Sequence, residues 1–197
     1  RQKKKQKQYT EFVKKKKYAV DVTLDPDTAN PLLILSADGK VVTCGDEWQN
    51  LPDTPERFNV CVNVLGKQWF SSGRFYYEVQ VSRKTLWTLG VVRENINRKE
   101  WITLKPQDGF WTVALWDENC YEARAGPSVP LTLREKVEKV GVFVDYDEGL
   151  VSFYDANSRS HIYSFTAQSF TEKKLYPFFC PGFNAGGKNA APLIISP

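Results

Sequence analysis

Few side chains in this 197-residue chain could carry out acid–base, nucleophilic or metal chemistry, and they lie far apart in the sequence. The only histidine, His161, lies in the strand-like stretch Ser160-His161-Ile162-Tyr163. A histidine acts as a general base when it can reach the proton of a nucleophile or substrate, and nothing in the sequence places a nucleophilic Ser or Cys beside this one. We therefore expect His161 to be a structural residue.

The cysteines do not predict a zinc site. Cys44, Cys61, Cys120 and Cys180 are separated by 17, 59 and 60 residues. Structural zinc sites use pairs of ligands only about two to four residues apart. A chain of this length buries roughly 70% of its unfolded surface without covalent staples. We predict free, mostly buried thiols, and neither a metal nor another cofactor.

Two further segments partly match known functional motifs, a calcium loop and a phosphate loop. Asp145, Asp147 and Glu148 could form a carboxylate pair, but the segment is too short for a calcium loop, and Asp147-Glu148-Gly149 between two apolar runs predicts a hairpin. The glycine-rich stretch 183–189 lacks the Gly-Lys-Ser/Thr of a phosphate loop and precedes a strand, so we expect a flexible binding loop. No catalytic residues are predicted, and we expect the chain not to be an enzyme.

Positive charge is concentrated in residues 1–17. This segment holds nine of the 27 Lys and Arg residues and one of the 23 acids, which leaves 18 basic and 22 acidic residues in the remainder. Nucleic-acid binding needs a basic surface, so it is not expected of residues 18–197. We interpret residues 1–17 as a basic linker or helix that could contact a membrane only indirectly, through anionic lipid. Tyr9, Phe12 and Val13 form a short apolar stripe at helical spacing, which predicts packing against the rest of the chain.

The sequence carries no run of some twenty apolar residues, no signal peptide and no Asn-X-Ser/Thr acceptor. These features favour a cytoplasmic domain, or one on the cytoplasmic face of a membrane protein.

Short runs rich in β-branched and aromatic residues alternate with Gly, Pro, Asn and Asp after residue 18. This pattern predicts an all-β antiparallel β-sandwich over residues 18–197, with a short N-terminal helix. We expect strands near 20–24, 32–36, 40–44, 60–65, 73–82, 86–93, 110–116, 119–123, 139–146, 149–155, 161–166, 176–179 and 192–195.

Alternation along two of these strands separates a core face from a candidate binding face, because successive side chains of a strand point to opposite sides. The predicted core residues are Trp87, Leu89, Val91, Trp111, Val113 and Leu115. The opposite face would carry Thr88, Gly90, Val92, Phe110, Thr112, Ala114 and Trp116, with a shallow depression at Gly90. Such a mixture of small, polar and aromatic residues is typical of a surface that receives a partner.

Trp116 is the main candidate anchor for a protein partner. Tryptophan is enriched at interface hot spots, and Asp117-Glu118-Asn119 would supply a polar rim. Burial under a loop is the alternative. Trp48, in a polar loop, is either a lid on the core or an exposed contact. For Trp101 we favour burial in the core, although its segment could also carry specificity.

Five segments, in this order, resemble the PRY-SPRY (B30.2) domain over roughly residues 18–197. They are Leu24-Asp25-Pro26-Asp27-Thr28-Ala29, Gly73-Arg74-Phe75-Tyr76-Tyr77-Glu78-Val79, Trp87-Thr88-Leu89-Gly90-Val91, Val144-Asp145-Tyr146-Asp147-Glu148-Gly149 and Tyr176-Pro177-Phe178-Phe179. The resemblance implies a non-catalytic binding sandwich, found at the carboxyl end of tripartite-motif ubiquitin ligases, in butyrophilins and in other immune proteins. The bloodthirsty-like ligases are the most similar group.

The resemblance also implies a pocket formed by Thr88, Ala114, Trp116 and Phe183-Asn184. Antibody-binding members have an acid at the Thr88 position and a second Trp at the Ala114 position, so the departures here argue against an immunoglobulin ligand. Phosphoantigen-sensing butyrophilins have His at the Thr88 position, so phosphate sensing is not supported either.

The expected function is therefore capture of a protein target, as the substrate-selecting domain of a tripartite-motif ubiquitin ligase in innate immunity. Ubiquitin transfer would be carried out by a RING domain absent from this sequence, and an upstream coiled coil could form a dimer. The alternatives are the cytoplasmic domain of a butyrophilin-like receptor, a lectin-like module for glycans or peptides, and nucleic-acid binding through residues 1–17.

Overall fold

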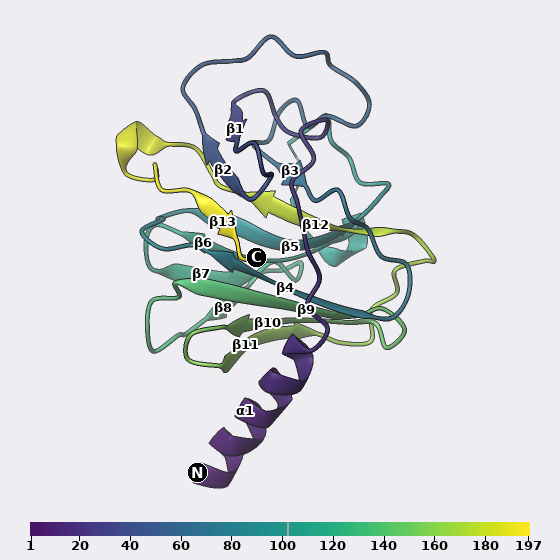
Figure 1. The fold of residues 1–197 in the computed structure, drawn as a ribbon, viewed down its shortest axis with the longest axis vertical. Helices are drawn as coiled ribbons and strands as arrows, with labels where there is room; N and C mark the ends of the chain where they lie inside the picture. Colours follow the sequence, from purple (N-terminus) through teal and green to yellow (C-terminus); the bar gives the residue numbers. More distant parts are fainter. Residues whose placement is uncertain (102) are drawn as a thin grey trace.

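Two antiparallel sheets face each other in a sandwich, and one helix projects from its end (Figure 1). This computed structural model describes residues 1–101 and 103–197. Among the described residues, the first sheet has the order β1-β2-β13-β4-β9-β10-β11 and the second β3-β12-β5-β6-β7-β8. The predicted all-β sandwich is confirmed.

The first sheet contains the following strands in spatial order: β1 (Leu33–Leu35), β2 (Val41–Cys44), β13 (Leu193–Ile195), β4 (Arg74–Gln80), β9 (Lys139–Asp145), β10 (Leu150–Asp155) and β11 (Ser160–Phe165). The second contains β3 (Val64–Leu65), β12 (Leu175–Cys180), β5 (Trp87–Arg93), β6 (Phe110–Trp116), β7 (Cys120–Ala123) and β8 (Val129–Leu131). Two short 3-10 helices, η1 (Pro106–Asp108) and η2 (Ala185–Gly187), lie in loops.

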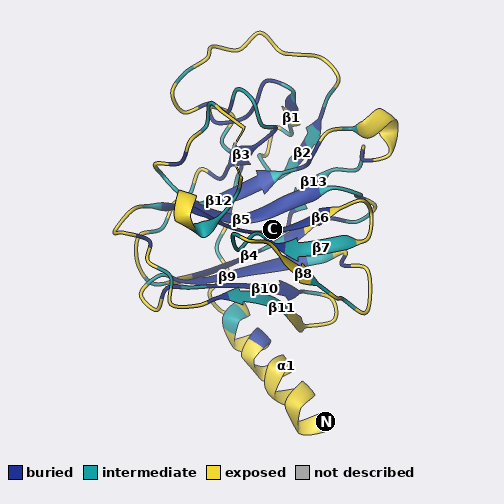
Figure 2. Cartoon of the chain, turned by 180° about the vertical axis from the view of Figure 1, so that it is seen from behind, coloured by how far each residue is buried: buried dark blue, intermediate teal, exposed yellow. Residues whose placement is uncertain are grey.

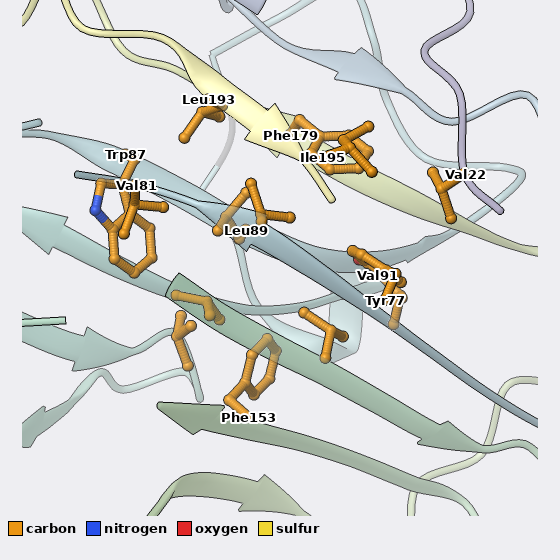
Figure 3. Packing of buried hydrophobic residues seen from close by; sticks show 14 of the residues in the cluster. Val22, Tyr77, Val81, Trp87, Leu89, Val91, Phe153, Phe179, Leu193 and Ile195 are labelled. Carbon is orange, nitrogen blue, oxygen red and sulfur yellow. The ribbon is translucent and has the colours of Figure 1, made fainter. Parts of the chain in front are cut away.

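The main core fills the space between the sheets. Alternate residues of β5 and β6, namely Trp87, Leu89, Val91, Trp111, Val113 and Leu115, are buried in it as predicted. Tyr77 and Phe153 from the first sheet lie in the same core (Figure 3). Removal of this apolar surface from water supplies the main driving force for folding.

The segment that begins at Asp25-Pro26 forms a turn. Asp25 Oδ1 accepts from Asp27 N at 3.0 Å, and Thr28 Oγ1 donates to Asp25 O at 2.8 Å. Thr28 Oγ1 also accepts from Leu65 N at 3.0 Å, which ties the turn to β3. The buried Arg57 donates to Pro26 O and Ala29 O, and so holds the turn from the other side.

Two predicted strands differ from the structure, and one strand was missed. Residues 20–24 are extended but form no regular strand, because they bond in succession to different segments: Val20 N to Tyr76 O, and Leu24 N to Gly39 O. The strand predicted over 60–65 shortens to β3. The edge strand β8 was missed because Pro130, which has no N–H to donate, makes its sequence look like a loop.

The helix α1 (Gln2–Lys16) docks on the first sheet and buries a single side chain there. Phe12 is buried against Tyr76, Phe143 and Tyr154, with ring centroids 6.1 Å from Tyr76 and 5.6 Å from Tyr154. Tyr9 and Val13 remain more than 40% exposed, so Phe12 is the only buried member of the predicted stripe. The Arg159 guanidinium lies over the exposed Tyr9 ring, 4.6 Å from its centroid. Apart from the half-buried Lys15, the rest of the helix is exposed, as the yellow ribbon in Figure 2 shows.

Candidate binding site

The outer face of the second sheet is more covered than alternation predicted. Val92 and Phe110 are buried there in a second apolar cluster whose other buried members are Phe58, Leu65, Ile96 and Phe178. Thr112 and Ala114 are also buried. The segments around Phe58 and Ile96 therefore cover one end of this face, and only its other end can receive a partner.

No depression exists at Gly90. A side chain there would meet the neighbouring strand, since a Cβ atom would lie 2.0 Å from Trp111 O and 2.9 Å from Thr112 Cα. The glycine serves close packing between β5 and β6, and the predicted depression was wrong.

A cavity of about 370 Å³ lies at the uncovered end of the face, where loops meet the start of β5 and the end of β12. Its volume is near the lower end of the range of small-ligand pockets, roughly 300–1,000 Å³. The described lining residues are Cys61, Val62, Asn63, Leu86, Trp87, Thr88, Trp101, Thr103, Leu104, Arg124, Cys180, Gly182 and Phe183.

Three predicted site residues line this cavity. Thr88 is buried and contributes to its wall, whereas Phe183 is 44% exposed. Trp101 is 70% exposed, so its predicted burial in the core was wrong. Asn97 Nδ2 donates a hydrogen bond to Glu100 Oε2 at 2.9 Å within the exposed loop that precedes Trp101. The Trp101 side chain is therefore accessible to a partner.

Trp116 lies beside the cavity without lining it. Trp87 is opposite Leu115 in the β5–β6 ladder, and Glu118 N donates to Thr85 O at 3.1 Å, which places Trp116 near Leu86. Its side chain is 43% exposed, so burial under a loop is excluded. Asp117 follows in an exposed turn with φ 49°, whereas Ala114 is 1% exposed and cannot contact a partner directly.

The other two predicted site residues lie outside the cavity lining. Asn184 is half-buried, and its Oδ1 accepts from Gly187 N at 2.9 Å, so it shapes the loop that carries Phe183. Trp48 is 58% exposed in a loop next to β2, so it is not a lid on the core, and its contact with a partner stays a prediction.

Sequence reasoning missed the residue that fixes the Phe183 loop. Asn189 is buried, and its Oδ1 accepts from Thr85 N at 2.9 Å and from Leu86 N at 3.3 Å. Its Nδ2 donates to Leu86 O, Pro181 O and Phe183 O at 2.9–3.0 Å. The Asn189 side-chain amide therefore joins the start of β5 to the loop. Nothing in the local sequence distinguishes Asn189 from an ordinary exposed loop residue.

Lys84 supports the same junction. Its Nζ donates to Asn189 O at 3.3 Å and to Ala191 O at 2.7 Å from a position with 1% exposure. Burial disfavours the charged form and lowers the pKa of Lys84 to about 8. Burial also raises the pKa of Cys180 to about 11, so this thiol lines the cavity as a neutral group.

The remaining chemical candidates have structural roles. Asp145 Oδ2 accepts from Arg74 Nε at 2.8 Å, and Asp147 Oδ2 accepts from Gly73 N at 3.1 Å, as turn carboxylates do. His161 Nε2 lies 2.6 Å from Ser164 Oγ, a contact that the sequence did not predict. Burial lowers the pKa of His161. Within residues 1–101 and 103–197 no cluster of three His, Cys, Asp or Glu side chains could hold a metal ion.

The thiols are less buried than predicted, since only Cys44 is fully buried and Cys61, Cys120 and Cys180 are half-buried. The helices in the described part of the chain are too short and too polar to span a bilayer.

An antiparallel sandwich with exposed aromatic side chains around a cavity in its loops fits the class of binding modules. Two family models match the chain: "SPRY domain" over residues 74–194 and "SPRY-associated domain" (PRY) over residues 22–70. The chain belongs to the PRY-SPRY (B30.2) family. PRY-SPRY is a protein-binding domain with no known catalytic activity, and it is a protein-interaction module in tripartite-motif proteins.

A solved structure, the TRIM65 PSpry domain, has the same fold, with a TM-score of 0.78, 22% identity and 94% of each chain covered. Human Pyrin is 47% identical over 95% of this chain and 24% of its own length. Mouse Erythroid membrane-associated protein is 48% identical over 89% of this chain and 31% of its own. Rat E3 ubiquitin-protein ligase TRIM69 is 46% identical over 88% and 34%. The chain thus spans about a quarter to a third of the length of these relatives.

Proposed function

We propose that this chain captures a protein target through the surface formed by Trp116, Phe183 and Trp101 around the cavity. The observation that carries this proposal is the exposure of all three aromatic side chains at one end of the second sheet. Aromatic side chains of this kind supply much of the binding energy at protein interfaces. Thr88, Asn184 and Asp117 add polar groups at or near the same surface.

In the whole protein, we propose that this domain selects the substrate of a tripartite-motif ubiquitin ligase that acts in innate immunity in the cytoplasm. Similarity to the ligase TRIM69 supports this role. Ubiquitin transfer would belong to a RING domain elsewhere in the protein, and an upstream coiled coil would make the protein a dimer.

A butyrophilin-like receptor tail is the second candidate. Similarity to Erythroid membrane-associated protein favours it, and so does the lysine-rich helix α1, which would suit a segment next to a membrane. The sequence upstream of residue 1 distinguishes the two candidates, since a RING domain with a coiled coil supports the ligase and a membrane span supports the receptor.

Affinity capture from cell lysate, read by mass spectrometry, tests target recognition with Trp116→Ala and Phe183→Ala. Each variant should lose the captured protein while the melting temperature changes by only about 2 °C or less, because both residues are more than 40% exposed and neither belongs to the buried core. Trp69→Ala is the matched control, since Trp69 is 46% exposed but does not line the cavity.

Unchanged capture by both variants would overturn the assignment of the site, and a large fall in both melting temperatures would show that these residues are structural. A glycan array probed with the same variants covers the lectin-like alternative. Glycan binding that persists without protein ligand would replace protein capture as the function.

A further inference from the structure

Arg124 is the one residue with a formal charge among the described residues that line the cavity. Its Nη1 donates to Glu122 Oε1 at 2.7 Å, so the pair is neutral overall. Arg124 Nε is buried and has no acceptor among the described residues. A guanidinium offers five N–H donors, and the Arg124 side chain is 32% exposed, so donors other than Nε can reach a ligand in the cavity. The cavity therefore offers hydrogen-bond donors without offering net charge.

The register of the sheet places Arg124 on the binding face. Ala114 pairs with Thr88 on one side and with Glu122 on the other, and Arg124 lies two residues beyond Glu122 on the same face of the chain. Arg124 N also donates to Thr112 O at 3.0 Å, which fixes the backbone at this point. The guanidinium is thus attached to the sheet itself, whereas Trp101 and Phe183 lie in loops.

The other lining groups suit an apolar occupant. Leu86, Leu104 and Phe183 supply aliphatic and aromatic surface, and the polar members Asn63, Thr88 and Thr103 are uncharged. A ligand carboxylate would compete with Glu122 for Arg124 and would be repelled by it in a poorly solvated site. A main-chain carbonyl oxygen could accept from the exposed part of the guanidinium without this repulsion, since the Arg124 side chain is 32% exposed.

Building on the proposed function, we propose that the cavity selects an uncharged segment of the protein partner. The segment inserts one apolar side chain beside Leu86 and Leu104, and one of its main-chain carbonyl oxygens accepts a hydrogen bond from the Arg124 guanidinium. Arg124 is then a determinant of specificity for neutral peptide segments.

Selection of a phage-displayed library of random peptides on the full chain tests the inference, followed by measurement of Kd for the enriched peptides. Enriched sequences should share an apolar residue and show no excess of Asp, Glu, Lys or Arg. Arg124→Met should weaken binding about tenfold, because the donor is lost while the aliphatic contact is kept. Glu122→Gln should leave Kd within about twofold, since it keeps the donor. Trp69→Ala again serves as the control outside the cavity.

If the Arg124→Met variant does not fold, a salt titration of the wild-type chain still tests the inference. The Kd of a neutral segment should change less than about twofold between about 0.05 and 0.5 M NaCl, whereas a charged segment would lose affinity steeply. Enrichment of acidic peptides, strong salt dependence, or a folded Arg124→Met variant that binds normally would overturn the inference while leaving protein recognition intact. A library that yields no peptide dependent on Phe183 would count against the proposed function itself, and the inference would fall with it.

Discussion

At the scale of single residues, Asn189 decides the shape of the binding site without contacting a partner. Its side chain makes five hydrogen bonds that join the start of β5 to the loop carrying Phe183. We predict that Asn189→Ala weakens target capture at least tenfold and lowers the free energy of unfolding by about 2–4 kcal/mol, because several buried backbone groups lose their partners. Binding assays and urea unfolding measure the two effects.

Hydrogen exchange distinguishes this positioning role from general destabilisation. In Asn189→Ala, the amides of residues 181–188 should exchange faster while those of β9 and β10 keep their protection. Asn184→Ala is the matched control for unfolding and hydrogen exchange, since it removes one side-chain hydrogen bond within the same loop, from Gly187 N, and should have a much smaller effect on both. Equal effects of the two substitutions would contradict the assignment.

At the scale of elements, the alternation of side chains predicted which residues of β5 and β6 face the core, but not which residues of the opposite face are covered by loops. Period-two patterning reports which side chains share a face, and it identified Trp87, Leu89 and Val91 correctly. Whether the opposite face is open depends on distant loops, and the residues that bury Phe110 come from the segments around Phe58 and Ile96. The same limit explains the error at Trp101, because a loop tryptophan carries no periodic signal.

The helix α1 buries only one side chain against the sandwich. A 15-residue helix rich in lysine is marginal by itself, and like charges such as Lys3 and Lys7 at i, i+4 destabilise it further. We predict that Phe12→Ala releases α1 from the first sheet, since Phe12 is the only side chain that the helix buries. Hydrogen exchange should show α1 amides losing protection by more than about tenfold while β4 and β10 remain unchanged.

Val13→Ala provides the comparison on the same helix, because Val13 is 41% exposed and its truncation should leave α1 docked. If α1 stays protected in Phe12→Ala, the helix is held by its polar contacts, such as Lys16 with Glu78 at 3.6 Å.

At the scale of the whole molecule, the charge is divided between a basic helix and a mildly acidic sandwich. Residues 1–17 hold nine basic residues and one acid, and the remainder has 18 basic and 22 acidic residues. In α1 every lysine except Lys15 is exposed, so contact with an anionic surface should be made by this end of the molecule.

We predict that the chain binds phosphatidylcholine vesicles only when phosphatidylserine is added, and that raising the salt concentration releases it. Replacing Lys3, Lys4, Lys5 and Lys7 by Gln should weaken vesicle binding by at least tenfold, since each lysine near the membrane surface contributes about 1 kcal/mol. The same change at four exposed lysines of the sandwich, Lys67, Lys136, Lys173 and Lys188, should have little effect in vesicle sedimentation. Equal losses from the two sets would show that net charge alone governs the interaction, and α1 would then have no special part in it.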